Sequence, residues 1–572
     1  MPQTHLKTTS SILSLDIPGL AMVLFTMLVI GCHQKASAPT KAELSAIGLK
    51  TGDIISCGGN EFGTVRFSIS CSERQADFEL ALKLLHSFEY DEAEKAFAAI
   101  IRMEPGCAMA YWGVAMANFH PIWAPPTADE LAKGARALKI ARQIAGKTQK
   151  EADYISAIGT FYDDWSTLDH YSRCLKFEAA MEKLYTTYPN DIEAALFYSL
   201  ALNAAASPSD KAFTRQRKAG AILDKLYDIE PNHPGVVHYI IHSYDSPELA
   251  ARALLAARKY AAVAPSSAHA LHMPSHIFTR LGLWEDCIKS NLAAVASAKC
   301  YADANGMKGH WDEEIHGLDY LVYGYLQKGD NEAAQRQLAY LKTINEVQPV
   351  TFKVAYAFAA IPSRLLLENK RWREAAQLKV HNANIVWKNF PWQNAIIQFT
   401  RAMGAIHTGD LARAKAGLQN LHTLHAALIE QKDPYKANQV MIQIKTAEAW
   451  LRCKEGKRTE AIALMELAAD MEDSTEKHPT TPGEVLPARE LCADLYLQLN
   501  KADKALKAYE QDLEKHPNRF NALYGAGVAA EQSGESDKAA AYYQKLIETV
   551  GPGNKERPEL TNARRFLKRN LG

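Results

Sequence analysis

Apolar side chains recur at intervals of three and four residues along most of the chain, from about residue 72 onward, and the strict alternation of a β-strand is scarce. Such spacing places the apolar residues along one face of an α-helix. Turn-forming residues interrupt the pattern at short intervals, which predicts turns between successive helices. The chain is therefore expected to be all-α, with helix pairs at residues 151–188, 191–230, 234–264, 266–298, 310–342, 351–380, 393–430 and 436–472.

Two units near the C-terminus repeat in the same register. Ala505 and Tyr509 lie 34 residues before Ala539 and Tyr543, and a unit at residues 90–105 has a similar small residue, aromatic residue and closing proline. Small residues let paired helices approach closely, and the aromatic residue fills the space beside the next pair. This pattern resembles the tetratricopeptide repeat (TPR), which implies a right-handed superhelix of stacked helix pairs whose first helices line a concave surface.

Several longer segments extend the resemblance over nearly the whole chain. They are CAMAYWG at residues 107–113, HPGVVHYIIHSYD at 233–245, HALHMPSHIFTRLG at 269–282, HGLDYLVYGYLQ at 316–327 and HPTTPGEVLPARE at 478–490. Together they look like a group of bacterial TPR proteins with exported or lipidated N-termini and no assigned activity. The resemblance implies the fold and export, and it supplies no reaction and no site residues.

The N-terminus has the features of a targeting segment. Residues 20–31 form a largely apolar run of about 12 residues, which suits a signal peptide better than a membrane span of about 20 residues. The run ends at Gly31-Cys32, which resembles the bacterial lipoprotein signal and implies a lipid on Cys32. His33 after the cysteine suggests an anchor in the outer membrane, facing the periplasm. Inner-membrane anchoring and simple secretion are the alternatives.

The chain thus divides into four expected parts. Residues 1–31 are the signal peptide, and residues 32–71 form a linker with a small, strand-like segment bracketed by cysteines. Residues 72–345 form a TPR-like array that carries most of the clustered histidines, and residues 346–572 form a second TPR array with a capping helix. Because an exported protein meets an oxidising compartment, we expect a disulfide between Cys57 and Cys71. The other cysteines after Cys32 are expected to be small buried residues.

The charge balance and the absence of familiar motifs exclude several classes of function. Positive and negative side chains number 65 each, so no basic excess argues for nucleic-acid binding. The sequence has no nucleophile motif, phosphate-binding loop or dinucleotide fingerprint. Serine hydrolase, kinase and dehydrogenase activities therefore have no support in the sequence.

Histidines are concentrated in one stretch. Eight of the 19 histidines lie between His233 and His316. On the expected repeats, this stretch supplies the first helices of three consecutive pairs. Residues four apart project from one face of a helix and can hold one ion. The candidate metal ligands are His238, His242, His269, His272, His276, His310 and His316.

Imidazole suits zinc, copper and iron, so a transition-metal site built from a subset of these histidines is the main hypothesis. Asp245, Asp312 and Asp319 could orient the ligands, and Glu313 and Glu314 are candidate general bases. Two alternatives stay open. The histidines could line a metal-free groove for an anionic ligand or peptide, or they could have unrelated structural roles.

Pro274 is the weak point of the one-face argument. Proline inside a helix clashes with the preceding turn, so a helix that begins near Pro274 would leave His269 and His272 on a different segment from His276. His86, His120 and His478 are expected to serve local packing or capping.

Three functions remain in competition. The first is binding of a protein or peptide in a concave groove that holds the metal site. The second is a metal-dependent enzyme, either a hydrolase or an oxidase, with an open coordination position. The third is metal storage or delivery.

Overall fold

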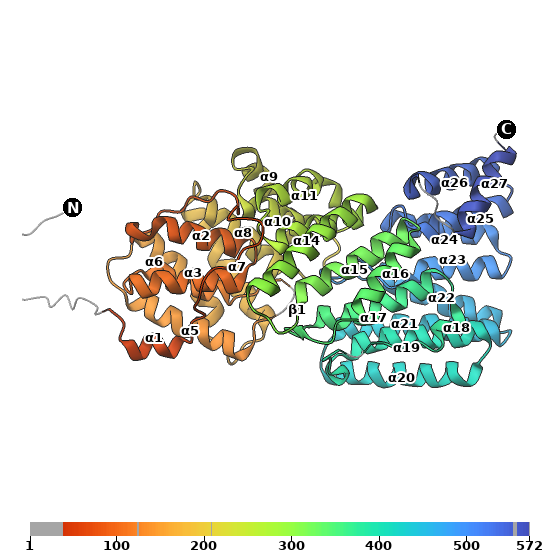
Figure 1. Cartoon of the computed structure of the whole chain (residues 1–572), viewed down its shortest axis with the longest axis horizontal. Helices are drawn as coiled ribbons and strands as arrows, with labels where there is room; N and C mark the ends of the chain where they lie inside the picture. The colour runs from red at the N-terminus through yellow and green to blue at the C-terminus, as the bar shows by residue number, and fades with distance from the viewer. Residues whose placement is uncertain (1–37, 123–124, 208, 382, 553–556, 571–572) are drawn as a thin grey trace, which may run out of the picture. The chain divides into compact units, whose positions relative to one another are not determined.

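A computed structural model of the chain describes residues 38–122, 125–207, 209–381, 383–552 and 557–570 (Figure 1). The predicted signal peptide and the predicted lipidation site, Cys32, lie outside these residues. Residues from Ala38 onward form one compact unit. In the described part of the chain, no helix combines the length and the apolar character needed to cross a membrane.

The structure is almost entirely helical, as the sequence predicts. The first elements are α1 (Lys41–Ile47), η1 (Ser72–Arg74), α2 (Gln75–His86), α3 (Tyr90–Met103), α4 (Ala108–Ala117), α5 (Ala128–Gln143), α6 (Gln149–Tyr162), α7 (His170–Thr187), α8 (Ile192–Ala204) and α9 (Thr214–Ile229). The region of clustered histidines follows, with α10 (Pro234–Tyr244), α11 (Ala250–Val263), α12 (Ala268–His272), α13 (Pro274–Arg280), α14 (Trp284–Ala304), β1 (His310–Trp311), α15 (Asp312–Gln327) and α16 (Asn331–Leu341).

The remaining elements complete the array. They are β2 (Val347–Gln348), α17 (Phe352–Glu368), α18 (Trp372–Ala375), η2 (Trp387–Asn389), α19 (Pro391–Thr408), α20 (Leu411–Glu430), α21 (Pro434–Lys454), α22 (Arg458–Asp473), α23 (Ala488–Gln498), α24 (Ala502–Lys515), α25 (Phe520–Gln532), α26 (Ser536–Val550) and α27 (Pro558–Asn570). The last of these corresponds to the expected capping helix.

Consecutive helices pack against one another throughout this unit. The two helices of a pair are in contact, as in α8 with α9 and α10 with α11, and each pair also contacts the next, as in α9 with α10 and α24 with α25 (Figure 1). The prediction of an all-α array of stacked helix pairs is therefore confirmed. A pair cannot bury its apolar face alone, so this stacking is what stabilises the array.

The small residues of the repeat have a direct steric role. A Cβ atom on Gly525 would lie 2.2 Å from Cζ of Tyr509, and one on Gly113 would lie 2.3 Å from Cε1 of Phe97. In both cases the glycine follows the aromatic residue by sixteen positions, on the first helix of the next pair. At these two positions the aromatic ring occupies the space that a side chain larger than that of glycine would need.

The N-terminal segment differs from its prediction as a strand. Residues 49–71 form no strand, and β1 and β2 are the only strands in the described ranges, paired in parallel. Val65, Phe67, Ile69 and Cys71 are nevertheless buried in alternation with exposed residues. The backbone bonds to turns between helices instead, as in Thr64 N–H to the carbonyl of Asn232, between α9 and α10, at 3.0 Å. The alternating sequence pattern therefore indicates that one side of residues 65–71 is buried, although the segment has no partner strand.

The predicted disulfide between Cys57 and Cys71 is wrong. Cys57 pairs with Cys300 of α14, and Cys71 pairs with Cys107 at the start of α4. The segment between Cys57 and Cys71 lies along several helices, so each cysteine meets a partner there rather than the other end of its own loop. Cys107 and Cys300 are therefore not the simple buried thiols that the sequence suggested.

Candidate metal centre

Six of the seven predicted ligands gather from four helices. His238 and His242 lie on α10, His269 and His272 on α12, His276 on α13 and His316 on α15. These helices are in contact, since α10 packs on α13 and α12 packs on α15. The histidines form two sets of three, each with ligand atoms within 4.8 Å of one another.

Pro274 separates α12 from α13, but this break does not decide how the histidines divide. It occupies the first position of α13, where its missing N–H is not needed, and it ends the five-residue α12 at His272. His272 and His276 lie on different helices, but their Nε2 atoms still meet across the helix end at 3.2 Å. His269 joins His238 and His242, while His272 joins His276 and His316. The question that Pro274 raised for the one-face argument thus has a divided answer, since His272 meets His276 and His269 does not.

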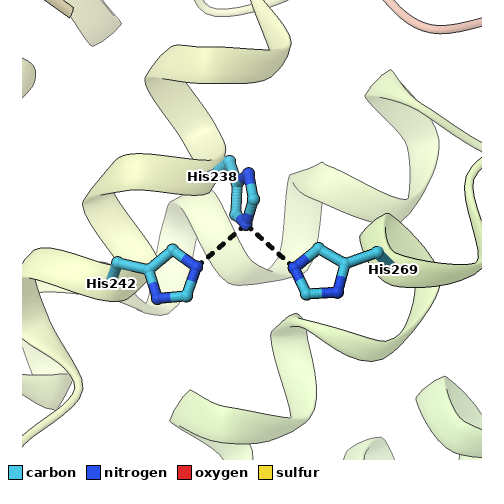
Figure 2. A group of neighbouring side chains, drawn as sticks. All are labelled: His238, His242 and His269. Atoms are coloured by element: carbon cyan, nitrogen blue, oxygen red, sulfur yellow. Dashed lines mark hydrogen bonds between the residues drawn. The ribbon is translucent and has the colours of Figure 1, made fainter. Parts of the chain in front are cut away.

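The first histidine group consists of His238, His242 and His269 (Figure 2). The Nε2 atom of His238 lies 3.0 Å from Nε2 of His242 and 3.2 Å from Nε2 of His269. Nδ1 of His238 lies 2.6 Å from the carbonyl oxygen of His86. A carbonyl only accepts, so Nδ1 carries the proton and Nε2 of His238 presents a lone pair to the other two rings.

The second histidine group consists of His272, His276 and His316. Nε2 of His272 lies 3.2 Å from Nε2 of His276, and the ring centroids of His272 and His316 are 4.3 Å apart. Nδ1–H of His276 donates to Oδ2 of Asp245 at 3.1 Å. Nδ1–H of His272 donates to Oδ1 of Asn291 at 2.7 Å.

Asn291 leaves no ambiguity about the proton of His272. Its Nδ2 donates to the Cys287 carbonyl at 2.8 Å, which fixes Oδ1 as the atom that faces His272. With both Nδ1 protons committed, the Nε2 lone pairs of His272 and His276 point at each other across 3.2 Å. The Tyr320 hydroxyl, 3.4 Å from Nε2 of His276, donates to the Thr480 carbonyl at 3.2 Å. Two facing lone pairs repel, and a cation between them removes the repulsion.

The spacing of these nitrogens matches metal coordination. Zinc binds imidazole nitrogen at about 2.0–2.1 Å, which in tetrahedral geometry puts two ligand nitrogens about 3.3 Å apart. The closest nitrogen pairs of both groups, at 3.0–3.2 Å, are near that value. All the ligand atoms of each group lie within 4.8 Å of one another, so each group can offer three nitrogens to one ion.

Burial keeps the six rings in the form that binds metal. It lowers the pKa of His238 to about 3, and it lowers the pKa of the other five histidines below the ordinary value, chiefly through loss of hydration. Neighbouring imidazoles lower it further. The rings are therefore neutral at physiological pH, as ligation requires.

Asp245 is the charged residue that supports the second group. Its Oδ2 also accepts from Lys477 at 3.2 Å, and its Oδ1 accepts from Arg280 Nε at 2.9 Å. Burial alone would raise the pKa of Asp245, but Lys477 and Arg280 lower it below its ordinary value. A histidine that donates to a carboxylate in this way is oriented for a metal. The expectation that Asp245 orients a ligand histidine agrees with this contact.

The structure does not bring His310, Asp312 or Asp319 into either group. His310 lies in β1 rather than on the expected helix, and its Nδ1 is 2.8 Å from Glu314. Asp312 contacts Thr351 and Lys353, and Asp319 pairs with Arg364. The side chains of Asp312 and Asp319, both on α15, therefore have partners outside the two groups.

The two candidate general bases are likewise engaged elsewhere. Glu313 pairs with Lys353, and Glu314 accepts from Tyr340 at 2.6 Å as well as contacting His310. No described contact joins either carboxylate to a histidine of the two groups. The structure therefore gives no support to a role as general base.

A third cluster was missed by the sequence analysis. His86 Nε2 and His233 Nε2 donate to the two oxygens of Glu193 at 2.7 and 2.9 Å. Nδ1 of His86 accepts from the Tyr239 hydroxyl at 2.9 Å, and Nδ1 of His233 accepts from Gly235 N–H at 3.1 Å. We call these residues the His86 network. Its three elements are distant in sequence, so no local motif announces it.

A cavity of about 360 Å³ adjoins the first group. His242 lines it together with Asp245, Arg280 and Lys477. Ile122, Phe213 and Tyr435 are among the apolar residues that line the rest of it. None of the other five histidines of the two groups is among the lining residues, so the first group contacts the cavity through His242 alone.

Comparison with known families supports the repeat architecture. The tetratricopeptide-repeat family pattern matches residues 78–120 and 493–554. These stretches contain α2 to α4 and the units around α24 to α26. No match was found among curated proteins.

Solved structures with a similar course of the chain include three repeat proteins. Human IFIT1 dimer with m7Gppp-AAAA is 12% identical, with 82% of this chain and 95% of that chain covered and a TM-score of 0.34. Yeast Tom70 is 11% identical, with 87% and 96% covered and a TM-score of 0.30. The TPR domain of P58(IPK) is 16% identical, with 66% and 99% covered and a TM-score of 0.20.

Likenesses at these identities and scores say nothing about the ligands of this chain. The match to the family and the packed helix pairs at both matched stretches carry the assignment by themselves. Arrays of this kind are scaffolds that bind proteins or peptides on an extended surface. The chain is an array of stacked helix pairs that carries tetratricopeptide repeats at residues 78–120 and 493–554.

Proposed function

We propose that this chain is an exported, lipid-anchored repeat protein that binds a transition metal ion at its second histidine group and a ligand or protein partner on the surrounding array. The metal is the part of the proposal that the geometry supports most directly. Zinc, copper and iron all accept imidazole nitrogen, and three neutral imidazoles leave a position for a further ligand.

One observation carries the metal proposal. His272 and His276 each have their Nδ1 proton committed to an oxygen acceptor, so their Nε2 lone pairs face each other at 3.2 Å. In a buried site of low dielectric, two facing acceptors repel more strongly than they would in bulk water, and a cation removes that repulsion. A metal ion turns the repulsion into two coordinate bonds.

Repeat scaffolds supply the reason for the partner. The stacked pairs expose a long surface on either side of the buried histidines, and such surfaces bind peptides and proteins. The N-terminal signal and Cys32 would hold the array at the membrane of the bacterial cell envelope, on its periplasmic side. In that setting the two disulfides would be stable.

A metal-dependent enzyme is the second candidate, and one observation favours it. His242 of the first group reaches a cavity of about 360 Å³, whereas a metal site with a purely structural role is normally closed. A small substrate could therefore approach an ion at the first group. The described residues offer no contact that would distinguish a hydrolase from an oxidase.

Metal analysis of the purified full chain tests the proposal. We expect at least one tightly bound transition metal ion per chain, measured by elemental analysis after exposure to zinc and removal of free ions. His272→Ala and His276→Ala should each lose one ion. His310→Ala is the matched control, because this histidine is 33% exposed and lies outside both groups. If His276→Ala retains the metal content of the wild type, the proposal is wrong.

A further inference from the structure

The cavity beside the first histidine group has an uneven distribution of charge. At its inner end, Arg280 and Lys477 share one carboxylate, that of Asp245. Both side chains are more than nine-tenths buried. Two cations against one anion leave this end of the cavity positive.

The outer charges of the cavity are paired. Lys436 forms an ion pair with Asp433 at 2.6 Å, and Lys211 forms one with Glu476 at 3.0 Å. Asp210, also at the wall, accepts from the backbone N–H of Thr214 at 2.9 Å. The excess positive charge therefore lies at the inner end, next to His242.

Lys477 has donor capacity left. An ammonium group has three N–H donors, and among the described residues Nζ of Lys477 reaches one acceptor, Oδ2 of Asp245 at 3.2 Å. Burial lowers the pKa of Lys477 to about 8, so the group is still largely charged at neutral pH. An ion at the first group would add two more positive charges, because its three histidine ligands are neutral.

We propose that the first histidine group holds a second metal ion, and that the cavity binds a small organic anion whose charged group contacts that ion, Lys477 and Arg280. The mixed lining defines the rest of the ligand. Ile122, Phe213 and Tyr435 suit an apolar body behind the anionic group. The volume of about 360 Å³ is that of a small-molecule site.

This inference rests on the proposed function, because it needs the chain to bind metal, but it concerns a different set of ligands. The division of roles follows from the geometry. The second group is buried and none of its three histidines lines the cavity, so its ion would exchange slowly. The first group opens through His242, and its ion would keep an exchangeable position.

Metal counting tests the second ion. The full chain loaded with Co²⁺ should hold two ions, and His242→Gln should hold one. If the wild type binds a single ion that His242→Gln retains and His276→Ala loses, this inference is wrong and the proposed function stands. If the wild type binds no ion, both are wrong.

Benzoate, acetate and inorganic phosphate test the ligand class by calorimetric titration. Benzoate should bind the loaded chain more tightly than acetate or phosphate, because only benzoate has an apolar body. Removing the metal with a chelator should weaken benzoate binding about tenfold or more, since a charge-assisted contact is lost. Tighter binding of phosphate than of benzoate would contradict the apolar part of the proposal, and equal benzoate affinity with and without metal would contradict its core.

Lys477→Met should weaken benzoate binding about tenfold while leaving two ions bound. Lys211→Met, which removes a lysine from an outer ion pair, is the control and should leave the affinity unchanged. The comparison of loaded and metal-free wild type needs no variant, so the inference stays testable if Lys477→Met fails to fold. Unchanged affinity in a folded Lys477→Met chain that holds two ions would overturn the proposed contact.

Discussion

The second histidine group and the His86 network are built from similar residues, and both are buried, yet they differ in where their protons are. In the network, each imidazole donates from Nε2 to Glu193 and accepts at Nδ1, so every donor meets an acceptor. In the second group, His272 and His276 donate from Nδ1, and their Nε2 atoms face each other. The Tyr320 hydroxyl lies 3.4 Å from Nε2 of His276 but has the Thr480 carbonyl as its acceptor at 3.2 Å. In both clusters the possible ligand atoms lie within 4.8 Å of one another, so their distances alone do not distinguish the two.

The difference teaches that hydrogen-bond accounting separates a structural cluster from a candidate ligand set. A buried network with every partner satisfied stabilises the fold without an ion. A buried set with facing acceptors is complete only with a cation. Each of the following experiments changes one side of this comparison.

Removing Glu193 should have the largest effect. Glu193→Ala leaves two buried imidazole N–H groups without an acceptor, and the free energy of unfolding should fall by about 3 kcal/mol. The loss should be the same with zinc and with a chelator, measured by urea denaturation. A Glu193→Ala chain that folds normally but lacks metal would show that the network, rather than the second group, is the metal site.

Metal binding should stabilise the chain by a smaller amount. Zinc at about 100 times its dissociation constant should raise the free energy of unfolding by about 2.7 kcal/mol, because it binds the folded chain. His276→Gln should lose this stabilisation at the second group, and His310→Gln should keep it. The measurement is urea denaturation at several zinc concentrations. Equal zinc stabilisation of His276→Gln and the wild type would contradict the assignment.

The acceptor for His272 offers a finer test. Asn291→Ala frees Nδ1 of His272 from its fixed partner, so metal affinity should fall about tenfold. Asn291→Asp restores an acceptor at the same place and should recover the affinity. Competition with a chromophoric chelator measures both. If Asn291→Asp binds as weakly as Asn291→Ala, the fixed proton of His272 is not what orients it.

The dependence on pH gives the smallest effect near neutrality. Burial alone would raise the pKa of Glu193, but His86 and His233 lower it to about 2. A carboxyl whose pKa is lower in the folded chain contributes stability above its ordinary pKa of about 4.5 and loses it as the pH falls towards 2. The difference in unfolding free energy between wild type and Glu193→Gln should therefore be constant from pH 7 to 5 and shrink below pH 4.5. A difference that shrinks already between pH 7 and 5 would contradict this.

Much of the fold could be predicted from the sequence because helix periodicity and repeat spacing are local signals. The pairs around α8 to α11 and α21 to α26 follow directly from it. The pairing of Cys57 with Cys300 could not be predicted, since it depends on where α14 lies against the N-terminal segment. Residues 65–71 bury every second side chain against helices, and a β-strand with one buried face shows the same alternation. The sequence pattern therefore does not distinguish the two.

The candidate site was predictable only in part. His238 and His242 form a local pair on one helix, so their spacing was informative. The sequence left open whether Pro274 breaks the helix, and the structure shows that His272 meets His276 across the helix end while His269 joins the other group. Asn291 and Lys477 come from distant elements, and nothing in the sequence around them indicates that they meet the histidines or Asp245.

The disulfide between Cys57 and Cys300 also changes the covalent connectivity of the chain. It closes a ring with a sequence separation of 243, and five of the six clustered histidines lie within it. A protease that cuts the ring once would open a loop but release no fragment, and all the histidines would remain on one molecule. In the chain-entropy account, a loop of this length destabilises the unfolded state by about 5 kcal/mol. An exported protein with this ring would tolerate a single cut between the two cysteines, whereas a cut between Cys300 and His316 would leave His316 on a separate fragment.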